Sequence, residues 1–496
     1  MEILIVIGII YGIFWMASNW NTPKQTSSLG HRMTSSISTA EKITTPISDS
    51  TRKAAKKHMM ADPSDLNLPP EFQLTDEFKI GFEAMENSKQ NLYITGEAGT
   101  GKTTLLKYFR NATKRNYVVV APTGVAAINC LGQTIHSFFK FPPKLIQKDD
   151  IKRAYNSHRI FDKLDMLIVD ESSMMRADLM DGIDYALRIN KGNMSMPFGG
   201  VQVVLFGDLF QLPPIIDKEL TEYYGKLYDS PYFFSANIFQ KIKFHRYNLT
   251  TNFRQHDGEF MALLNKIRNR NLGESAMRAL NARVQLGITN SIQDCITLTP
   301  TNRAANELNR SRLSNLSTKE FIYSARIMGD FDQASYPTEV ELALKVGAQV
   351  MMIKNDKAKK WVNGSIGEIV ALKGDLVRVR IGDAEHTVES VVWQKIRYKY
   401  DNEQDKIVEE VVGSFEQYPI KLAWAITIHK SQGLTFDKVI VDLDSGAFAH
   451  GQVYVALSRC RSLEGLFLKR PVAYSDIVFD ERIHRINDYF HDLVPS

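Results

Sequence analysis

The sequence predicts an α/β protein with two parallel-sheet domains and an all-β insert in the second domain. Two sets of short, apolar, β-rich runs alternate with amphipathic helical stretches, and such alternation forms parallel sheets covered by helices on both faces. With 496 residues and 44% apolar content, the chain is long enough for two or more cores. The first set of strands is expected at residues 91–95, 117–121, 166–170 and 201–206, and the second at residues 295–299 and 439–443.

Close-spaced β-rich runs with glycine turns and no long helix lie between the strands of the second set. This pattern predicts a small β-barrel inserted into the second domain. Its strands are expected at residues 346–353, 366–372, 376–381 and 387–393.

The N-terminal part of the chain differs in composition from the rest. Residues 3–17, within an apolar segment that we assign to residues 1–20, form a nearly unbroken apolar run, but about 20 residues are needed to cross a bilayer. Glu2 stands where a secretory signal carries basic residues, so a short membrane anchor, a targeting segment and a dispensable leader are all considered. Residues 21–65 are basic and rich in Ser and Thr, which is typical of a flexible tether. Its positive charges would keep an anchored chain on the cytosolic side.

Charge and cysteine content narrow the possible sites and compartments. The 61 Lys and Arg residues against 56 Asp and Glu residues give a formal charge of only +5, so any nucleic-acid site must be a local groove. Cys130, Cys295 and Cys460 lack CxxC spacing, which argues against both a disulfide framework and a zinc site. A reducing compartment is expected: the nucleus, the cytosol or an organelle matrix.

The segment NLYITGEAGTGKTTLLKYF contains a phosphate-binding loop between a strand and a helix. Its glycines let backbone N–H groups face phosphate oxygens, Lys102 would reach the β- and γ-phosphates of ATP, and Thr103 would offer a hydroxyl to Mg²⁺. The residues expected to bind nucleotide are Gly96, Glu97, Ala98, Gly99, Thr100, Gly101, Lys102, Thr103 and Thr104.

The segment LDMLIVDESS ends an apolar strand with two adjacent carboxylates. Asp170 would complete the Mg²⁺ site with Thr103, and Glu171 would orient and deprotonate the attacking water. These residues favour a nucleotide hydrolase.

Taken together, these and later segments resemble the ordered motifs of superfamily-one helicases, and most closely the Pif branch. The later segments are APTGVAA and TIHSFF (121–139), PFGG with GDLFQLPP (197–214), NFRQ (252–255), VGAQVMM with NGSIGE (346–368), ITIHKSQGLTFD (426–437) and VYVALSRCRS (453–462). The resemblance covers residues 66 to about 476.

The resemblance implies two RecA-like domains with one ATP between them. It places the first domain at residues 66–235, with a wedge insert near residues 139–160, and the second at residues 236–340 and 418–496. An SH3-like β-barrel would occupy residues 341–417. It also implies that Gln211 senses the γ-phosphate and that Arg254 and Arg459 approach it from the second domain, so that hydrolysis depends on domain closure. The catalytic set is then Lys102, Asp170, Glu171, Gln211, Arg254 and Arg459.

The resemblance further implies single-stranded and forked DNA as partners, with one strand lying across both domains. Phe138 and Phe139 are interpreted as stacking on bases, with wedge or core roles as alternatives, and residues 139–153 as a strand-separating wedge or an exposed basic loop. The expected DNA contacts are Thr123, His136, Thr427, His429, Lys430 and Ser431, although both histidines fit core positions equally well.

One position departs from the family pattern. Where the family has a glutamine that reads adenine, this chain has Phe78, and Gln73 lies five residues earlier, too far to assume that it substitutes. The choice of ATP over other nucleoside triphosphates is therefore open.

The predicted function is an ATP-dependent DNA helicase acting in replication, repair or recombination. Movement from 5′ to 3′ is implied only by the resemblance. The alternatives are a non-unwinding module that binds ATP and nucleic acid, and an RNA-directed motor.

Overall fold

The computed structural model describes residues 41–43, 68, 72–155, 158–216, 218–255, 257–285, 295–444 and 446–493, all within one compact unit. The predicted apolar segment lies outside these residues, as does the predicted tether apart from strand β1 (Glu41–Ile43). No helix within the described ranges is long and apolar enough to span a membrane.

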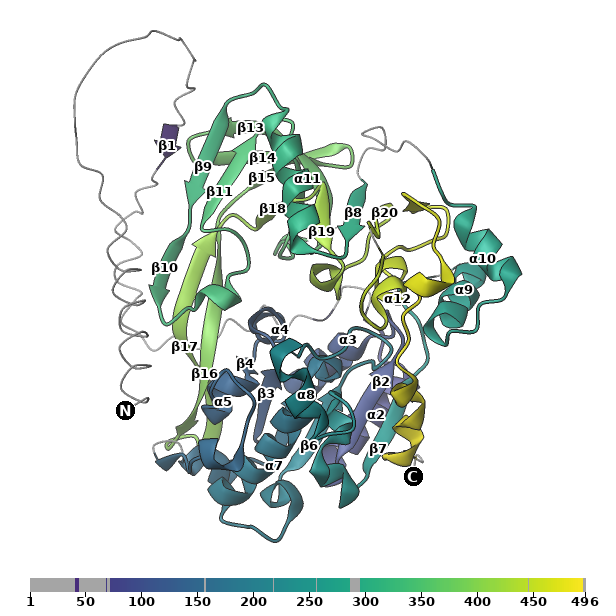
Figure 1. Ribbon diagram of the computed structural model, residues 1–496. Coiled ribbons are helices and arrows are strands. Elements are labelled where there is room, and N and C mark those ends of the chain that lie inside the picture. The colour runs from purple at the N-terminus through teal and green to yellow at the C-terminus, as the bar shows by residue number, and fades with distance from the viewer. Residues whose placement is uncertain are drawn as a thin grey trace, which may run out of the picture. The chain divides into compact units, whose positions relative to one another are not determined.

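A seven-stranded, fully parallel sheet organises the first lobe (Figure 1). The strand order is β22-β7-β2-β6-β5-β3-β4. The strands are β2 (Leu92–Gly96), β3 (Tyr117–Ala121), β4 (Gln133–Thr134), β5 (Met166–Val169), β6 (Gln202–Phe206), β7 (Phe244–Leu249) and β22 (Phe490–Asp492). The four strands expected in this domain are thereby confirmed, with ends shifted by at most one residue.

Helices cover both faces of this sheet because alternate residues of each buried strand point to opposite sides. Ile94 and Ile168 pack against α2 (Asp76–Asn87) and α3 (Lys102–Ala112). Tyr93 and Leu167 belong to the core on the other face. That face is covered by α5 (Ile135–Phe139), α6 (His158–Lys163) and α7 (Ala177–Lys191). Two other short helices complete the lobe: α4 (Gly124–Asn129) follows β3, and α8 (Thr221–Gly225) follows the 3-10 helix η8 (Lys218–Leu220).

The expected boundary after residue 235 is wrong. Strand β7 lies beyond that position and pairs with β2, and the C-terminal strand β22 pairs with β7. The first lobe therefore continues to Leu249 and takes its edge strand from the end of the chain. Strands β7 and β22 are short and contain charged residues, so neither has the apolar run that predicted the other strands.

The second lobe has a four-stranded parallel sheet in the order β19-β8-β20-β21. It contains the two strands expected there, which confirms the second parallel sheet. The strands are β8 (Ile296–Thr299), β19 (Ala425–Thr427), β20 (Val439–Val441) and β21 (Leu466–Leu468). The helices are α9 (Gly258–Arg268), α10 (Glu274–Asn281), α11 (Asn302–Ser314) and α12 (Gln452–Leu457).

The insert is all-β, as expected, with its five-stranded antiparallel sheet in the order β15-β14-β13-β12-β18. The predicted strand at residues 387–393 is wrong, because this run crosses the turn between β15 and β16. The strands of the insert are β9 (Glu320–Ser324), β10 (Arg326–Gly329), β11 (Glu341–Lys345), β12 (Gln349–Met352), β13 (Ile366–Lys373), β14 (Leu376–Ile381), β15 (Ala384–Val388), β16 (Val391–Asp401), β17 (Lys406–Gln417) and β18 (Ile420–Leu422).

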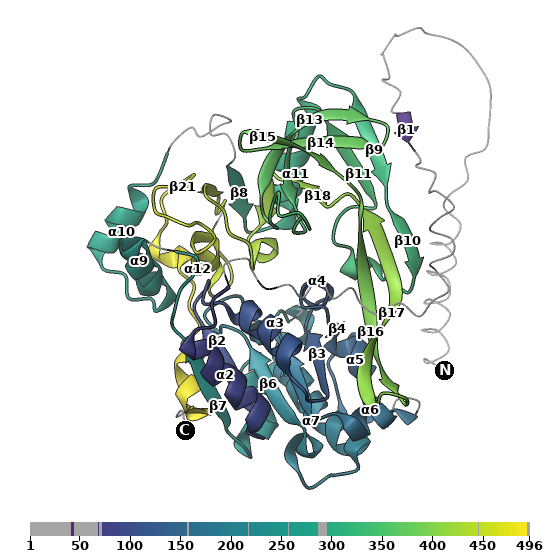
Figure 2. The same ribbon diagram turned by 180° about the vertical axis from the view of Figure 1, so that it is seen from behind.

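Strands β16 and β17 form a long hairpin that extends from the insert to the first lobe (Figure 2). The Tyr398 hydroxyl accepts a hydrogen bond from the Val119 amide at 3.2 Å, and Tyr398 belongs to the first lobe's core. Glu409 pairs with the buried Arg110 at 2.7 Å. The insert is thus fixed to the first lobe by buried polar contacts.

Candidate active site

The phosphate-binding loop joins β2 to α3 at the carboxyl edge of the first sheet. Gly101 has a φ of 81°, and a Cβ atom there would lie 2.7 Å from Cζ of Phe78. Both the left-handed backbone and the close contact require glycine. The α3 N-terminus consequently faces the loop, which concentrates N–H groups and positive potential there.

Lys102 crosses the loop from the first turn of α3. Its Nζ donates hydrogen bonds to the carbonyl oxygens of Gly96 at 2.7 Å and Glu97 at 3.0 Å. Burial lowers the pKa of Lys102, although the carboxylates of Asp208 and Glu171 oppose that effect. The loop therefore presents a partly desolvated cation to an anionic ligand.

Asp170 and Glu171 follow β5 at the same edge of the sheet. The Glu171 amide donates to Oδ1 of Asp170 at 3.0 Å, and Glu171 has a φ of 50°, in the left-handed region. Burial, together with the neighbouring Glu171 charge, raises the pKa of Asp170 to about 7, and burial also raises the pKa of Glu171. Two adjacent, half-buried carboxylates require positive charge nearby.

The donor set at this point fits Mg²⁺. Asp170 and Thr103 line one cavity and offer oxygen ligands, which Mg²⁺ prefers. Among the described residues, no cluster of three or more His, Cys, Asp or Glu side chains could hold a metal ion.

The cavity has a volume of about 800 Å³ and lies between the two lobes. It brings together all six predicted catalytic side chains. Of the predicted nucleotide-binding residues, Ala98, Gly99, Gly101, Lys102, Thr103 and Thr104 line it, whereas Gly96, Glu97 and Thr100 do not. Those three shape the loop instead: Lys102 bonds the first two, and the Thr100 hydroxyl donates to the Glu97 carbonyl at 3.0 Å.

Two arginines bring positive charge to the cavity. Arg459, at the end of α12, is 1% exposed, and its Nε donates to the Val455 carbonyl at 3.0 Å. Arg254 lies in the connection between β7 and α9, rather than within the second lobe as expected. Burial lowers the pKa of Arg459 to about 9, with the Arg254 charge adding to the effect, and burial lowers that of Arg254 to about 10. An anion between these guanidinium groups would relieve their mutual repulsion.

Gln211 is buried where the two lobes meet. Its Nε2 donates to Oδ2 of Asp208 at 3.2 Å, and its Oε1 accepts from Gln432 of the second lobe at 3.4 Å. Its amide therefore links the end of β6 to the loop that follows β19. This position lets one side chain contact both walls of the cavity.

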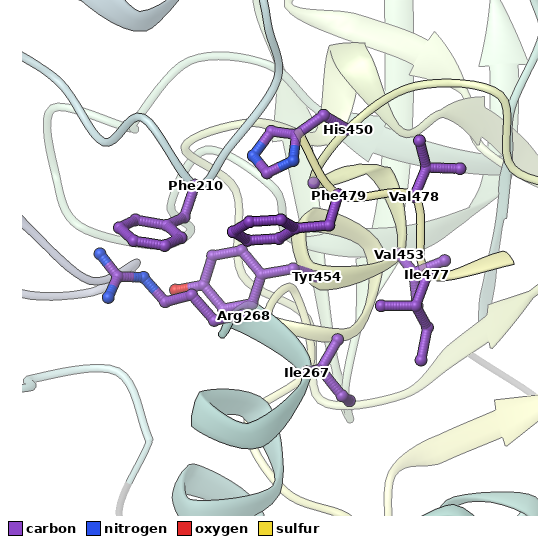
Figure 3. A pocket seen from close by; sticks show the side chains of 10 residues that line it. Phe210, Ile267, Arg268, His450, Val453, Tyr454, Ile477, Val478 and Phe479 are labelled. Atoms are coloured by element: carbon purple, nitrogen blue, oxygen red, sulfur yellow. The ribbon is translucent and has the colours of Figure 1, made fainter. Parts of the chain in front are cut away.

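A buried network behind Gln211 was not predicted from the sequence. Arg268 of α9 donates to Oδ1 of Asp208 at 3.0 Å, and its guanidinium lies 3.8 Å from the ring centroid of Phe210. Tyr454 of α12 accepts a hydrogen bond from the Ala98 amide of the phosphate-binding loop at 3.3 Å. Figure 3 shows the Arg268 side chain next to the ring of Phe210, with Tyr454 labelled in the same group. The sequence indicated Asp208 only through its position at the end of a strand. No local pattern indicated Arg268 or Tyr454, because their partners belong to the other lobe.

The predicted DNA contacts fall into two groups. Three hydroxyls are engaged locally: Thr123 accepts from the Ala126 amide and caps α4, Thr427 accepts from the Lys430 amide, and Ser431 donates to the Ile428 carbonyl. Lys430 is exposed, while His136 and His429 are half-buried, with pKa values lowered by burial. Contact of these six residues with DNA stays a prediction.

The interpretation of Phe138 and Phe139 as base-stacking residues is wrong. Their rings pack edge to face with centroids 4.9 Å apart in the first lobe's core, where they are 8% and 7% exposed. Within the predicted wedge, Phe141, Ile146 and Ile151 belong to the same core. The segment is therefore anchored in the core of the first lobe and is not a simple exposed loop; its role as a strand-separating wedge stays a prediction.

Gln73 lines the same cavity as the phosphate-binding loop. Phe72 and Phe78 also line this part of the cavity.

Comparison with known proteins gives one consistent family. The model of the PIF1-like helicase family matches residues 73–278, and that of the UvrD-like helicase C-terminal domain matches residues 422–464. The ATP-dependent DNA helicase Pif1 of Bdellovibrio bacteriovorus is 32% identical over 393 residues, covering 77% of this chain and 84% of the relative. The ATP-dependent DNA helicase PIF1 of Emericella nidulans is 30% identical over 484 residues, covering 83% of this chain and 62% of that longer relative.

Solved structures agree with these matches. Bacteroides sp Pif1 in complex with ADP-AlF4 superimposes with a TM-score of 0.78 at 37% identity, covering 85% of this chain and 100% of that one. Bacteroides Pif1 bound to ssDNA gives a TM-score of 0.61 at 38% identity, covering 84% of this chain and 97% of that one.

Proposed function

This chain belongs to the PIF1-like helicase family, and from that membership we propose that it is an ATP-dependent DNA helicase that moves along single-stranded DNA. The observation that carries the proposal is the cavity between the lobes. One wall holds a phosphate-binding loop and two carboxylates, the other supplies Arg459, and Arg254 comes from the connection between the lobes. The names of the relatives and the ssDNA complex of Bacteroides Pif1 support DNA as the track.

The charges around the cavity fit phosphoryl transfer. In that reaction negative charge spreads over the transferred group, so catalysis depends on positioning and electrostatic stabilisation. Lys102, Arg254 and Arg459 would stabilise this charge, and Glu171, whose pKa is raised by burial, would accept the proton of the attacking water. Thr103 and Asp170 would hold Mg²⁺, which neutralises phosphate charge when bound.

Movement would follow from closure of the cavity. Phosphates attract side chains from both walls when ATP binds, and this attraction weakens after hydrolysis. Repeated closing and opening would shift the lobes along a bound strand. We propose 5′-to-3′ movement and a role in replication, repair or recombination, as the family resemblance implies.

The first test is nucleotide hydrolysis with and without single-stranded DNA. We expect single-stranded DNA to stimulate hydrolysis by the intact protein and a matched RNA strand to stimulate it less.

Lys102→Ala should reduce hydrolysis by at least about 100-fold, because the cation that contacts the phosphates is lost. Glu171→Gln should retain nucleotide binding and stall turnover.

Exposed residues provide controls for these variants. Lys89→Ala and Glu219→Gln change the same residue types at exposed positions and should hydrolyse ATP like the wild type. Folded protein that no single strand stimulates would contradict the helicase proposal. Wild-type rates in Glu171→Gln would show that the general base is misassigned.

Polarity requires its own substrates. Forked DNA with only a 5′ tail should be unwound, and the same duplex with only a 3′ tail should not. The reverse preference would overturn the proposed direction.

The apolar run at residues 3–17 supports a separate proposal of membrane attachment, with the lobes on the cytosolic side in a reducing compartment. Membrane fractionation of the full chain against a chain starting at Asp65 tests it. Equal solubility of the two would contradict attachment.

A further inference from the structure

Asn252 lies two residues before Arg254, in the connection between β7 and α9. Arg254 lines the cavity, whereas Asn252 is half-buried and is not among the described residues that line it. We propose that Asn252 is a positioning residue for nucleotide hydrolysis, whose side-chain amide fixes Arg254 to the phosphate-binding loop. This inference rests on the proposed ATP hydrolysis and adds a residue that acts on the reaction without touching the nucleotide.

Both halves of the Asn252 amide are engaged, each with a different segment of the chain. Its Nδ2 donates a hydrogen bond to the Ala98 carbonyl of the phosphate-binding loop at 3.1 Å. Its Oδ1 accepts from the Arg254 amide at 2.8 Å and from the Gln255 amide at 3.1 Å. One side chain therefore holds the loop and the backbone of the arginine at the same time.

The two halves differ in what they explain. An asparagine oxygen commonly accepts from backbone amides two or three residues further on, so the bonds of Oδ1 are those of an ordinary turn. The bond of Nδ2 is not part of such a turn, because Ala98 lies more than 150 positions away along the chain. This second bond is what connects the turn of Arg254 to the loop.

The loop leaves room for this connection at Gly99. A Cβ atom on Gly99 would lie 2.7 Å from Oδ1 of Asn252 and 2.6 Å from Cβ of Arg254. The Gly99 carbonyl accepts a hydrogen bond from the Phe253 amide at 2.9 Å. The loop and the segment that carries Arg254 are thus in direct contact, and a shift of one would move the other.

Ala98 is also held from the second lobe. Its amide donates to the hydroxyl of Tyr454 at 3.3 Å, while its carbonyl accepts from Asn252. The side chain of Gln255 donates to the carbonyl oxygens on either side of Arg459, at 3.0 and 3.2 Å. The hydrogen bonds that meet at Asn252 therefore connect one residue of the loop with the segments of both arginines.

Placement matters for an arginine that stabilises transferred charge. Such a residue contributes about 1,000-fold or more to kcat when it is in position, and a displacement of about 1 Å can cost about 100-fold. With its backbone fixed to the loop, Arg254 needs only a side-chain movement to reach the phosphates that Lys102 binds. Without the bond to Ala98, the arginine and the loop would move independently.

Asn252→Ser tests the connection while keeping the turn. A serine hydroxyl can still accept from the following amides, but it is too short to reach the Ala98 carbonyl. In DNA-stimulated ATP hydrolysis we expect kcat to fall about 10-fold with KM within about twofold of the wild type, because a misplaced arginine weakens transition-state stabilisation and leaves ground-state binding unchanged. The melting temperature should stay close to that of the wild type.

A double variant shows whether Asn252 acts through Arg254. Arg254→Ala alone should lower kcat by at least about 100-fold, and adding Asn252→Ser should lower it no further, since the group to be positioned is already absent. Asn315→Ser, at an exposed asparagine of the second lobe, is the matched control and should hydrolyse ATP like the wild type. Asn252→Asp keeps the size and the acceptor but lacks the donor, and repeats the comparison if the serine variant melts early.

The outcomes separate this inference from the proposed function. A wild-type kcat in the folded Asn252 variants, a rise in KM alone, or losses that multiply with that of Arg254→Ala would overturn the positioning role and leave the helicase proposal intact. Absence of DNA-stimulated hydrolysis in the wild type would overturn both.

Discussion

His450 is a buried imidazole with a partner on each ring nitrogen. Nδ1 accepts a hydrogen bond from the Asp480 amide at 3.0 Å, so Nε2 carries the proton and donates to the Leu209 carbonyl at 3.2 Å. Phe479 packs edge-on against the ring (Figure 3). Burial lowers the pKa of His450 to about 4, although the carboxylates of Asp480 and Asp208 oppose this effect.

This histidine predicts a loss of stability in mild acid. In the unfolded chain it should titrate near its ordinary pKa of about 6.5, so between that value and about 4 the unfolded state binds more protons than the folded state. Stability should therefore fall as the pH drops through this window, with His450 contributing about 2 kcal/mol of loss between pH 7 and pH 5.

Denaturant unfolding at the two pH values, for the wild type and His450→Gln, isolates that contribution. The variant should be less stable overall but should lose less stability on acidification. An equal loss in both proteins would show that His450 is not responsible.

At the scale of elements, the C-terminal strand β22 completes the first lobe's sheet. Phe490 on this strand is 5% exposed, and its ring centroid lies 4.9 Å from that of Tyr93 and 5.8 Å from that of Phe239. The end of the chain is thus part of the nucleotide-binding lobe. Strand β22 pairs with β7, although the second lobe and the insert lie between these two strands in the sequence.

Phe490→Ala should destabilise the protein by about 3–5 kcal/mol, the usual cost of truncating a buried phenylalanine. Thermal unfolding of the intact chain would measure it, with Phe448→Ala as control, because Phe448 is 64% exposed. If the two variants melted at the same temperature, β22 would not contribute to the stability of the lobe.

Sequence patterns predicted those strands and helices whose residues form a recognisable pattern within a short stretch of the chain. Strand β3 was placed to the residue because an apolar run of five lies between two turns. Strand β7 was missed as part of the first sheet because Arg246 and Asn248 interrupt its apolar pattern, and its neighbour β22 lies more than 240 positions away along the chain. The apolar residues on both sides of Glu389 and Ser390 hid the turn between β15 and β16.

The same distinction applies to the site. Lys102 begins the helix after a phosphate-binding loop, and Asp170 and Glu171 directly follow a strand, so short motifs were enough to assign them. Arg254 and Arg459 needed the family resemblance.

At the scale of the whole molecule, one buried ion pair joins the two lobes. Asp208, at the end of β6, has a fully buried side chain, and Arg268 belongs to the last turn of α9. Although burial favours the neutral acid, Arg268 and Lys102 hold the pKa of Asp208 below its ordinary value. The pair lies directly behind Gln211, so the nucleotide cavity and the junction of the lobes share one charged network.

Arg268→Met should be strongly destabilising. It keeps much of the apolar contact but leaves Asp208 without its main counter-charge, and breaking a buried pair in this way costs about 3–5 kcal/mol. Adding Asp208→Asn should recover part of that loss, because the unpaired charge disappears while Gln211 keeps a side-chain acceptor.

The two single variants and the double variant form a cycle that can be measured by thermal unfolding and by DNA-stimulated hydrolysis. We expect the double variant to melt above Arg268→Met but to remain impaired in hydrolysis, because the neutral pair no longer draws α9 towards β6. If the two substitutions were additive in both measurements, Asp208 and Arg268 would act independently, and the lobes would have to be joined through other contacts such as that of Tyr454 with Ala98.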